Sequence, residues 1–541
     1  MMREMAHKGQ VANRFTAVLA VFLALILAGC SSIPPGANYP KIVSHASLKA
    51  DDTDLGRHFA TAASEHVGAS AFRIIPVGID GFLLRMQIIN AAQRTLDIQY
   101  YIFHIDETGQ LLTDAVLRAA DRGVHVRLLV DDGDTMSGDE TIALLAAHPS
   151  IEVRFFNPFA YRGHMEFFRG IEFVFNASRL DYRMHNKLLV ADNAIALVGG
   201  RNIGDEYFQI DPALQVADDD VFAAGPIIGP LSAAFDQYWN SDLAIPAQAL
   251  SARSRSVAAL SERRAALTQH NRALKADGTD FVARIATGEP YHGILSGNLP
   301  LVWATAQLVC DSPDKKEVDN GTMVGKLMRR PVAKVASAVQ SELLMITPFL
   351  IPGKEGMQLF DDLRRRQVRV RILTNSLEST SEMSAQSGYM HYRVPIIESG
   401  IELYEIRSLL GNTKGSGETA TIAKAGNYSL HAKLFVFDRS KVFIGSMNFD
   451  QRSMHLNTEI GLIIESPELA QQLAARFDAM AQPQNAYHVT LAADGADATP
   501  KLVWTTQENA QPVEYRSEPA RSDWQRLAAH LLTLLPWDDE L

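Results

Sequence analysis

Two histidines, each followed two positions later by a lysine, determine the chemistry that this sequence is able to perform. The pairs are His185 with Lys187 and His431 with Lys433. Residues two apart on a strand point to the same face, so each pair presents an imidazole and an ammonium group together. A neutral imidazole can attack phosphorus, a protonated one can donate to a leaving oxygen, and ammonium groups stabilise phosphoryl charge. Two such pairs brought together would suit phosphodiester chemistry without a metal ion.

Each pair belongs to a longer pattern, in which aspartate, glycine and asparagine follow the histidine at the same offsets in both copies. A lone pair is common in proteins, but two full patterns with equal spacing indicate one shared site. An odd offset on a strand reverses the face, so we expect both aspartates to be structural, whereas the asparagines can add donors to phosphoryl oxygens. The copies differ where Gly200 corresponds to Ser446, which gives a hydroxyl contact on one side only. The patterned residues are Asp192, Gly199 and Asn202, then Asp438, Gly445 and Asn448.

An imidazole that performs such chemistry needs an acceptor for its other ring nitrogen, usually a carboxylate. Segments 218–223 and 459–464 have matching patterns downstream of the two motifs. We therefore assign Asp218 and Glu459 as the orienting carboxylates. Because three aspartates stand in a row at 218–220, the first assignment stays open among Asp218, Asp219 and Asp220.

The elements that must position these residues are repeated as well. Apolar, strand-like runs alternate with polar amphipathic segments in both halves, which predicts α/β lobes, each a mixed sheet flanked by helices. We expect a first lobe over 66–290, a second over 291–506 and a C-terminal extension over 507–541. The matched runs are 96–102, 124–130 and 151–156 in one half and 343–347, 368–374 and 401–406 in the other.

The first thirty residues have the organisation of a secretion signal. Residues 27–30, Leu-Ala-Gly-Cys, resemble a bacterial lipobox, which implies a signal peptide over 1–29, acylation of Cys30 and a tether over 30–65. An ordinary signal peptide or a short anchor is the alternative. The resemblance implies a protein anchored by lipid in the bacterial envelope and facing the periplasm, with the outer membrane favoured because no aspartate follows Cys30.

The composition argues against some classes of function. The chain has 541 residues and a formal charge of −11, which argues against a general nucleic-acid binder because such proteins usually carry a basic excess. Cys310 is the only cysteine besides Cys30, and we expect it in the core. Lysine is a poor zinc ligand and no cluster of ligands shows metal-binding spacing, so we expect neither metal nor cofactor.

Through His185, Lys187 and Asp192 and their counterparts in the second motif, the sequence resembles the phospholipase D superfamily. The resemblance extends over most of residues 70–470. It implies a two-lobe pseudo-dimer with one active site at the lobe interface. It also implies metal-independent phosphatidyl transfer through a phosphohistidine intermediate.

Within that superfamily the sequence looks most like the bacterial cardiolipin synthase C-type branch, in segments 184–193, 198–208 and 218–226. This likeness implies transfer of a phosphatidyl group to phosphatidylglycerol at a membrane surface, with phosphatidylethanolamine as a possible co-substrate. The alternatives are a phospholipase D that uses water as acceptor, a nuclease or other phosphodiesterase, and a noncatalytic envelope lipoprotein. By analogy with related two-motif enzymes we favour His185 as the nucleophile. The oligomeric state stays open.

Overall fold

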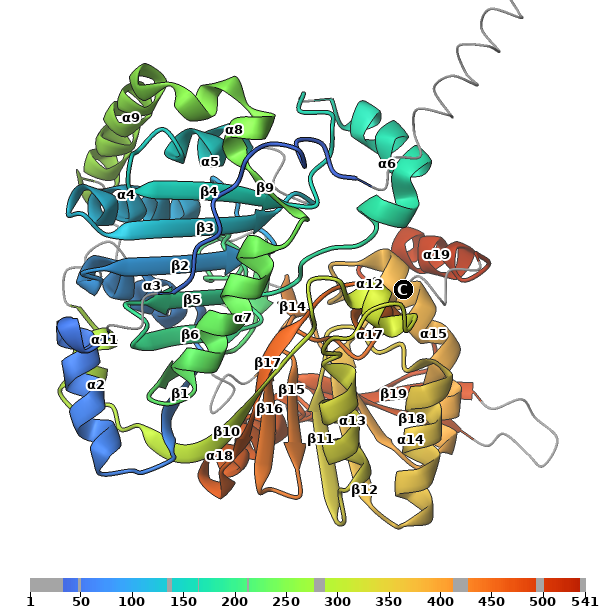
Figure 1. Cartoon of the computed structure of the whole chain (residues 1–541). Coiled ribbons are helices and arrows are strands. Elements are labelled where there is room, and N and C mark those ends of the chain that lie inside the picture. The colour runs from blue at the N-terminus through green and yellow to red at the C-terminus, as the bar shows by residue number, and fades with distance from the viewer. Residues whose placement is uncertain are drawn as a thin grey trace, which may run out of the picture.

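The computed structural model describes residues 33–46, 50–133, 139–163, 165–211, 214–276, 288–411, 427–492 and 501–535. The proposed signal peptide and Cys30 therefore lie outside the described residues. The chain folds into two lobes stacked one above the other, each a mixed sheet with helices against it (Figure 1). The expected α/β class with two similar lobes is confirmed.

The first lobe has the strand order β9–β4–β3–β2–β5–β6–β8–β1. Strands β2, β3 and β4 run parallel, and the remaining neighbours are antiparallel. β5, β6 and β8 are apolar runs buried along their whole length, as expected for strands covered on both faces. The strands are β1 (Ser70–Ile75), β2 (Thr95–Tyr100), β3 (His125–Asp131), β4 (Ile151–Phe156), β5 (Leu188–Ala191), β6 (Ile195–Gly199), β8 (Asp220–Ala224) and β9 (Ala244–Pro246).

The second lobe repeats this order as β18–β13–β12–β11–β15–β16–β17–β10 and extends it by β19 and β20 beyond β18. Edge strands β1 and β10 pair antiparallel and join the two sheets. The strands are β10 (Val302–Cys310), β11 (Glu342–Ile346), β12 (Arg369–Asn375), β13 (Glu402–Ile406), β15 (Leu434–Phe437), β16 (Lys441–Gly445), β17 (Ile460–Glu465), β18 (Ala486–Ala492), β19 (Lys501–Glu508) and β20 (Gln511–Tyr515).

One hydrophobic core crosses the lobe interface. It joins side chains of both sheets to those of α7 and α18, so the lobes share a buried layer rather than meeting through a linker. A further core lies on the outer side of each sheet beneath the remaining helices. The helices of the first lobe are α3 (Gly78–Ala91), α4 (Glu107–Asp121), α5 (Asp139–Leu145), α6 (Glu166–Leu180), α7 (Ile228–Asn240), α8 (Ala247–Leu250) and α9 (Val257–Ala276). Those of the second are α12 (Lys315–Asp319), α13 (Arg329–Ser337), α14 (Gly353–Arg365), α15 (Met383–Glu398), α17 (Gln451–His455), α18 (Pro467–Met480) and α19 (Asp523–Leu532).

The ends of the lobes differ from the expected boundaries. Part of the expected tether belongs to the first lobe, because α2 (Asp54–Ser64) buries Leu55 and Phe59 in its outer core. α11 (Tyr291–Leu295) also packs against the first lobe, so the chain crosses to the second near residue 300. β20, which lies in the expected C-terminal extension, continues the second sheet. α2 and α11 add buried apolar residues to the core of the first lobe, whereas β20 adds an edge strand to the second sheet.

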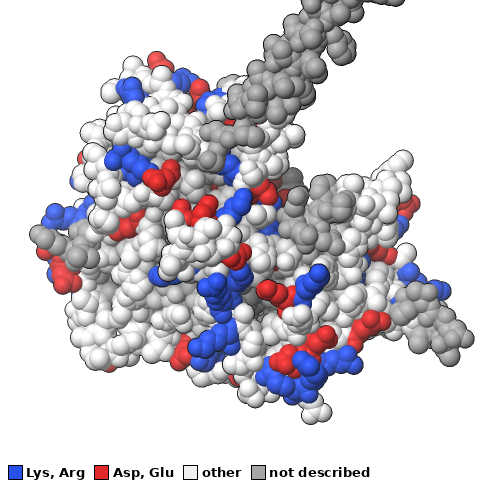
Figure 2. All heavy atoms as spheres, turned by 45° about the vertical axis from the view of Figure 1, so that its right-hand side comes forward, with Lys and Arg blue, Asp and Glu red and all other residues white. Residues whose placement is uncertain are grey.

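The surface and the helices give two further observations. Figure 2 shows lysines and arginines in short groups separated by aspartates and glutamates on the face that it presents. Among the residues that the structure describes, no helix is both long enough and apolar enough to cross a bilayer. Cys310 is buried, as expected for a core residue.

Candidate active site

Each motif histidine is held by a carboxylate of the opposite lobe. His185 Nδ1 lies 2.9 Å from Glu459 Oε2, and His431 Nδ1 lies 2.6 Å from Asp218 Oδ2. Both carboxylates are fully buried. The carboxylates accept the Nδ1 proton, so each ring keeps Nε2 as the nitrogen that can react.

Backbone hydrogen bonds between the lobes place each histidine beside a carboxylate of the opposite lobe. His185 N–H donates to Thr458 O at 2.9 Å, directly before Glu459. His431 N–H donates to Ala217 O at 2.7 Å, directly before Asp218. The second contact extends a two-stranded parallel ribbon of β7 (Gln215–Ala217) and β14 (Tyr428–Leu430). Each histidine therefore enters the site beside the carboxylate that orients it.

The two lysines occupy equivalent places next to the histidines. Lys187 Nζ donates to His185 O at 2.8 Å, and Lys433 Nζ donates to His431 O. Burial lowers the pKa of Lys433 to about 8 and that of Lys187 well below its usual range. Because burial disfavours the charged form of both lysines, an anion bound beside them would favour their ammonium forms.

The two histidine–carboxylate pairs differ electrostatically. Burial raises the pKa of Glu459 to about 7, although Lys187 opposes the shift. Burial would also raise the pKa of Asp218, but Lys433 and His431 outweigh it and hold the pKa below its usual range. Burial and then Lys433 lower the pKa of His431 to about 3, and burial and Lys187 hold the pKa of His185 well below its usual value. Both imidazoles are therefore neutral in the empty site.

The row of three aspartates resolves into three separate contacts. Asp218 faces His431, as described above. Asp219 forms an ion pair of 3.1 Å with Arg476 of α18, across the lobe interface. Asp220 pairs with Arg85 at 2.8 Å and Arg201 at 3.1 Å inside the first lobe. Only the first of the three reaches an imidazole.

The difference between Gly200 and Ser446 follows from the carboxylates beside them. Ser446 Oγ donates to Glu459 Oε2. A Cβ atom at Gly200 would lie 2.2 Å from Asp218 Oδ1, which leaves no room for a side chain. Glycine is therefore found next to Asp218, which lies against the backbone of residue 200, and serine is found next to Glu459. The expected one-sided hydroxyl contact is present.

The remaining motif residues are placed around this centre. A Cβ atom at Gly199 would lie 2.4 Å from Asp219 O, and one at Gly445 would lie 2.5 Å from Ile460 O, so glycine permits the close approach of the next strand. Asn202 Oδ1 accepts from Ile102 N at 3.2 Å. The side-chain nitrogen of Asn202 and the side-chain oxygen of Asn448 are buried and bond to no described group. Both side-chain amides can therefore form a further hydrogen bond with a bound molecule.

Asp192 and Asp438 stand apart from the imidazoles. Asp192 accepts backbone N–H groups of residues 93–95, at the start of β2, and Asp438 accepts those of residues 340–342, at the start of β11. Both have a left-handed backbone, with φ of 54° and 49°. They anchor the turn after each motif strand, which is the structural role that the odd offset predicts.

Sequence reasoning missed four residues that shape the site. Asp131 Oδ2 accepts Met184 N–H at 2.8 Å, and Asn375 Oδ1 accepts Leu430 N–H at 2.9 Å, so each holds the residue before a motif histidine. They end the matched strands β3 and β12, and equal offsets within the repeat could have revealed them. The rings of Tyr101 and Tyr207 lie edge-on to His185 and His431, with centroids 5.0 and 5.3 Å apart. No repeated spacing marks these tyrosines.

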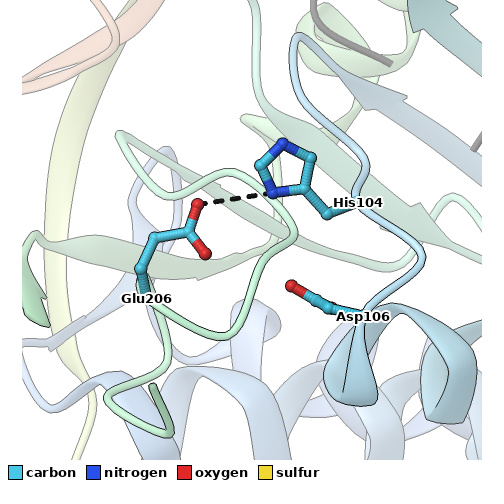
Figure 3. Close-up of side chains that lie close together, drawn as sticks. All are labelled: His104, Asp106 and Glu206. Atoms are coloured by element: carbon cyan, nitrogen blue, oxygen red, sulfur yellow. Dashed lines mark ion pairs between the residues drawn. The ribbon is translucent and has the colours of Figure 1, made fainter. Parts of the chain in front are cut away.

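A separate cluster adjoins the loop that follows Asn202. His104, Asp106 and Glu206 offer ligand atoms within 4.8 Å of one another (Figure 3). His104 Nδ1 lies 3.4 Å from Glu206 Oε1. Both Asp106 oxygens already accept backbone N–H groups, from Gly109 at 3.0 Å and from Asp205 at 2.7 Å. The cluster therefore fixes this loop to the start of α4, and the carboxylate that would complete a metal site serves as a helix cap.

Comparison with known proteins places these features in a wider group. A family model described as cardiolipin synthase, PLD-like domain, matches residues 86–239 and 332–481, which contain one motif each. Cardiolipin synthase C of Escherichia coli is 34% identical over 475 residues, covering 87% of this chain and 96% of that protein. An uncharacterised protein of Helicobacter pylori (strain ATCC 700392 / 26695) is 28% identical over 96% of this chain and 99% of its own length. The major cardiolipin synthase ClsA of Bacillus subtilis is 25% identical, covering 75% of this chain and 67% of that protein.

Proposed function

Because the chain belongs to the cardiolipin synthase family with phospholipase D-like domains, it is a phosphatidyltransferase, and we propose that phosphatidylglycerol is both its donor and its acceptor. Phosphatidylethanolamine is a possible co-substrate. The observation that carries the proposal is the composite site, in which two imidazoles and two lysines of different lobes meet around buried carboxylates. The catalytic set is His185, Lys187, Asn202, Asp218, His431, Lys433, Asn448 and Glu459.

In the first step Nε2 of His185 attacks phosphorus and the bond to the leaving glycerol oxygen breaks. His431 gives its proton to that oxygen, and a phosphatidyl group stays on His185. Assignment of His185 as nucleophile is supported by its deeper burial, because a less hydrated imidazole attacks more readily. Glu459 accepts the Nδ1 proton and favours the positive charge that develops on the ring.

In the second step the head-group hydroxyl of another phosphatidylglycerol gives its proton to His431 and attacks the same phosphorus. The P–N bond breaks, His185 leaves as a neutral imidazole, and cardiolipin and glycerol are the products. Lys187, Lys433 and the amides of the two motif asparagines stabilise the phosphoryl oxygens in both steps. These groups supply the charge stabilisation that a metal ion would otherwise give.

The first step needs a protonated His431, whereas this ring is neutral in the empty site. An anionic phosphodiester beside the ring raises its pKa, because a nearby negative charge favours the imidazolium. Substrate binding and proton uptake are therefore coupled. This coupling keeps the acid unavailable until a phosphodiester is bound.

Hydrolysis to phosphatidic acid is the alternative within this chemistry, and it differs only in the acceptor that enters the second step. Nuclease activity is less favoured, because the formal charge is −11 and basic groups alternate with acidic ones on the face of Figure 2. We also propose acylation at Cys30 and a periplasm-facing location, with the outer membrane preferred. The lipobox resemblance supports this part of the proposal.

The deciding experiment uses the purified full chain with phosphatidylglycerol vesicles, with and without phosphatidylethanolamine, in the presence of EDTA. We expect cardiolipin to form and to be lost in His185→Ala and His431→Ala. His125→Ala is the matched control, because His125 is an exposed histidine at the far end of β3. Phosphatidic acid as the only product would identify a hydrolase, and loss of activity in EDTA would contradict the metal-free mechanism.

The anchor is tested separately in cells. Labelling with palmitate should mark the wild-type chain and leave Cys30→Ala unmarked, and fractionation of the two membranes should place the wild type in the outer one. Equal labelling of both chains would contradict acylation at Cys30.

A further inference from the structure

Helix α6 has its polar and apolar sides reversed relative to an ordinary surface helix. Phe167 and Val174 are 70% and 72% exposed, and further apolar side chains stand exposed beside them. Its arginines point inward instead: Arg169 stacks on the ring of Phe159 at 4.1 Å, and Arg179 donates to Asn157 Oδ1 at 2.7 Å. A surface helix normally buries its apolar side. The other exposed apolar residues here are Met165, Phe168, Ile171 and Phe173.

Helix α19 of the other lobe presents a second apolar stripe. Trp524 is 79% exposed in the helix and Leu534 is 78% exposed in the turn that follows it, and the helical spacing of the stripe places its α19 members on one side of the helix. The opposite side is fixed to the lobe, because Gln525 Nε2 donates to Leu377 O at 2.7 Å and Ala529 is fully buried. The stripe is completed by Leu527, Leu531 and Leu535.

The two helices lie on the same side of the molecule, one from each lobe (Figure 1). Figure 2 turns this side toward the viewer, and its upper right edge carries few charged side chains. α6 ends five residues before His185, and its C-terminal turn touches the second lobe through Lys316 Nζ, which donates to Ser178 O at 3.1 Å. The apolar surface of α6 is thus linked closely to the first motif and to the lobe interface.

We propose that the exposed apolar side chains of α6 and α19 form a docking surface that enters the interfacial region of a phospholipid bilayer. The described chain begins at the exposed Ile33, three residues after Cys30, and Figure 1 shows this N-terminal segment running toward the same side. The preceding 32 residues include the apolar run 15–27. Exposed phenylalanine, leucine and tryptophan side chains suit the boundary between headgroups and acyl chains.

The proposed docking surface rests on the proposed function. It extends that function by placing the composite site against the lipids that the enzyme uses. A chain held only by one acylated residue could rotate freely, whereas two inserted helices fix which side faces the bilayer. Phospholipid could then reach the site between the lobes without leaving the membrane surface. The bilayer is the occupant to which the proposal commits.

The test compares one activity on two forms of the same lipid, phosphatidylglycerol vesicles and a short-chain phosphatidylglycerol below its micelle concentration. The variants are Phe167→Ser with Val174→Ser, and Leu527→Ser with Leu531→Ser, each in the full chain. We expect a loss of about tenfold or more on vesicles and wild-type rates on the short-chain lipid. Val67→Ser, at a position 93% exposed but in neither helix, should keep both rates.

Unchanged rates on vesicles, or equal losses on both forms, would overturn the proposal and leave the stripes as a protein-binding surface. A wild type inactive on both forms would instead contradict the proposed function. A second measurement does not depend on turnover. Trp537 is first replaced by Phe, so that it does not contribute to the signal from this end of the chain. Lipids brominated in the acyl chain should then quench the fluorescence of Trp524. Quenching that persists in Trp524→Phe would also count against the docking surface.

Discussion

Nδ1 of His185 lies 2.9 Å from the carboxylate of Glu459, although the two residues belong to different lobes and stand 274 positions apart. Asp218 and His431 form the reciprocal contact. Neither motif histidine has its orienting carboxylate in its own lobe. The active site is therefore shared, and its activity depends on how the lobes pack.

Replacing Glu459 with Gln should lower kcat by about 100-fold or more, because an amide no longer stabilises positive charge on His185. KM should change far less, since Glu459 is buried behind the ring. Steady-state kinetics on phosphatidylglycerol vesicles measure both quantities. A KM effect without a kcat effect would mean that Glu459 acts in binding.

The pH profile of kcat, which reports the complex in which bound substrate has already protonated His431, should be bell-shaped, with limbs near pH 7 and pH 8. On the acid side Glu459, with a pKa of about 7, takes up a proton and no longer serves as acceptor for His185. On the alkaline side Lys433, with a pKa of about 8, loses its charge. Lys433→Arg should move the alkaline limb upward by more than one pH unit, because a guanidinium stays charged. An alkaline limb that does not move would assign it to another group.

Glu459→Gln should also stabilise the fold at pH 8 and have little effect at pH 4. The folded-state pKa of Glu459, about 7, exceeds the ordinary glutamate pKa of 4.5, so the folded chain binds the proton more tightly than the unfolded chain. Stability from this group is full below pH 4.5 and is lost as pH rises to 7, by about 3 kcal/mol at most. Thermal unfolding of wild type and variant at both pH values checks this. A variant that is destabilised at pH 8 would contradict it.

Exchange of the small residues beside the two carboxylates should have unequal effects. Gly200→Ser should destabilise the protein by about 1–3 kcal/mol, because the new side chain meets Asp218. Ser446→Gly should fold normally and raise the acid limb of the pH profile, because it removes a hydrogen bond that lowers the pKa of Glu459. Equal destabilisation by both changes would contradict the asymmetry seen in the structure.

The ion pair of Asp219 with Arg476 should hold the lobes in register. Asp219→Asn and Arg476→Met should each cost about 3–5 kcal/mol, since each leaves a buried group without its partner across the interface. The double variant should be less destabilised than the sum of the two. Chemical denaturation of the four proteins gives the coupling, and strict additivity would show that the pair does not act as a unit.

The sequence by itself determined the two motifs, the α/β lobes and the family. These features depend on residues that are close together in the sequence. Alternation along a strand places His185 and Lys187 on one face, and equal spacing in the two motifs shows the repeat. The same local rule made Asp192 and Asp438, seven residues beyond each histidine, structural residues rather than catalytic ones.

Only the tertiary structure decided which carboxylate serves which histidine. Asp218, Asp219 and Asp220 have nearly identical local sequence, and their partners come from three different places in the fold. The positions of Tyr101 and of the exposed apolar side chains of α6 could not be predicted either, because a local sequence pattern does not show which surfaces the other lobe will cover. The motifs supply the reactive groups, and the packing of one lobe on the other completes the site, because each imidazole must find its carboxylate across more than 200 positions.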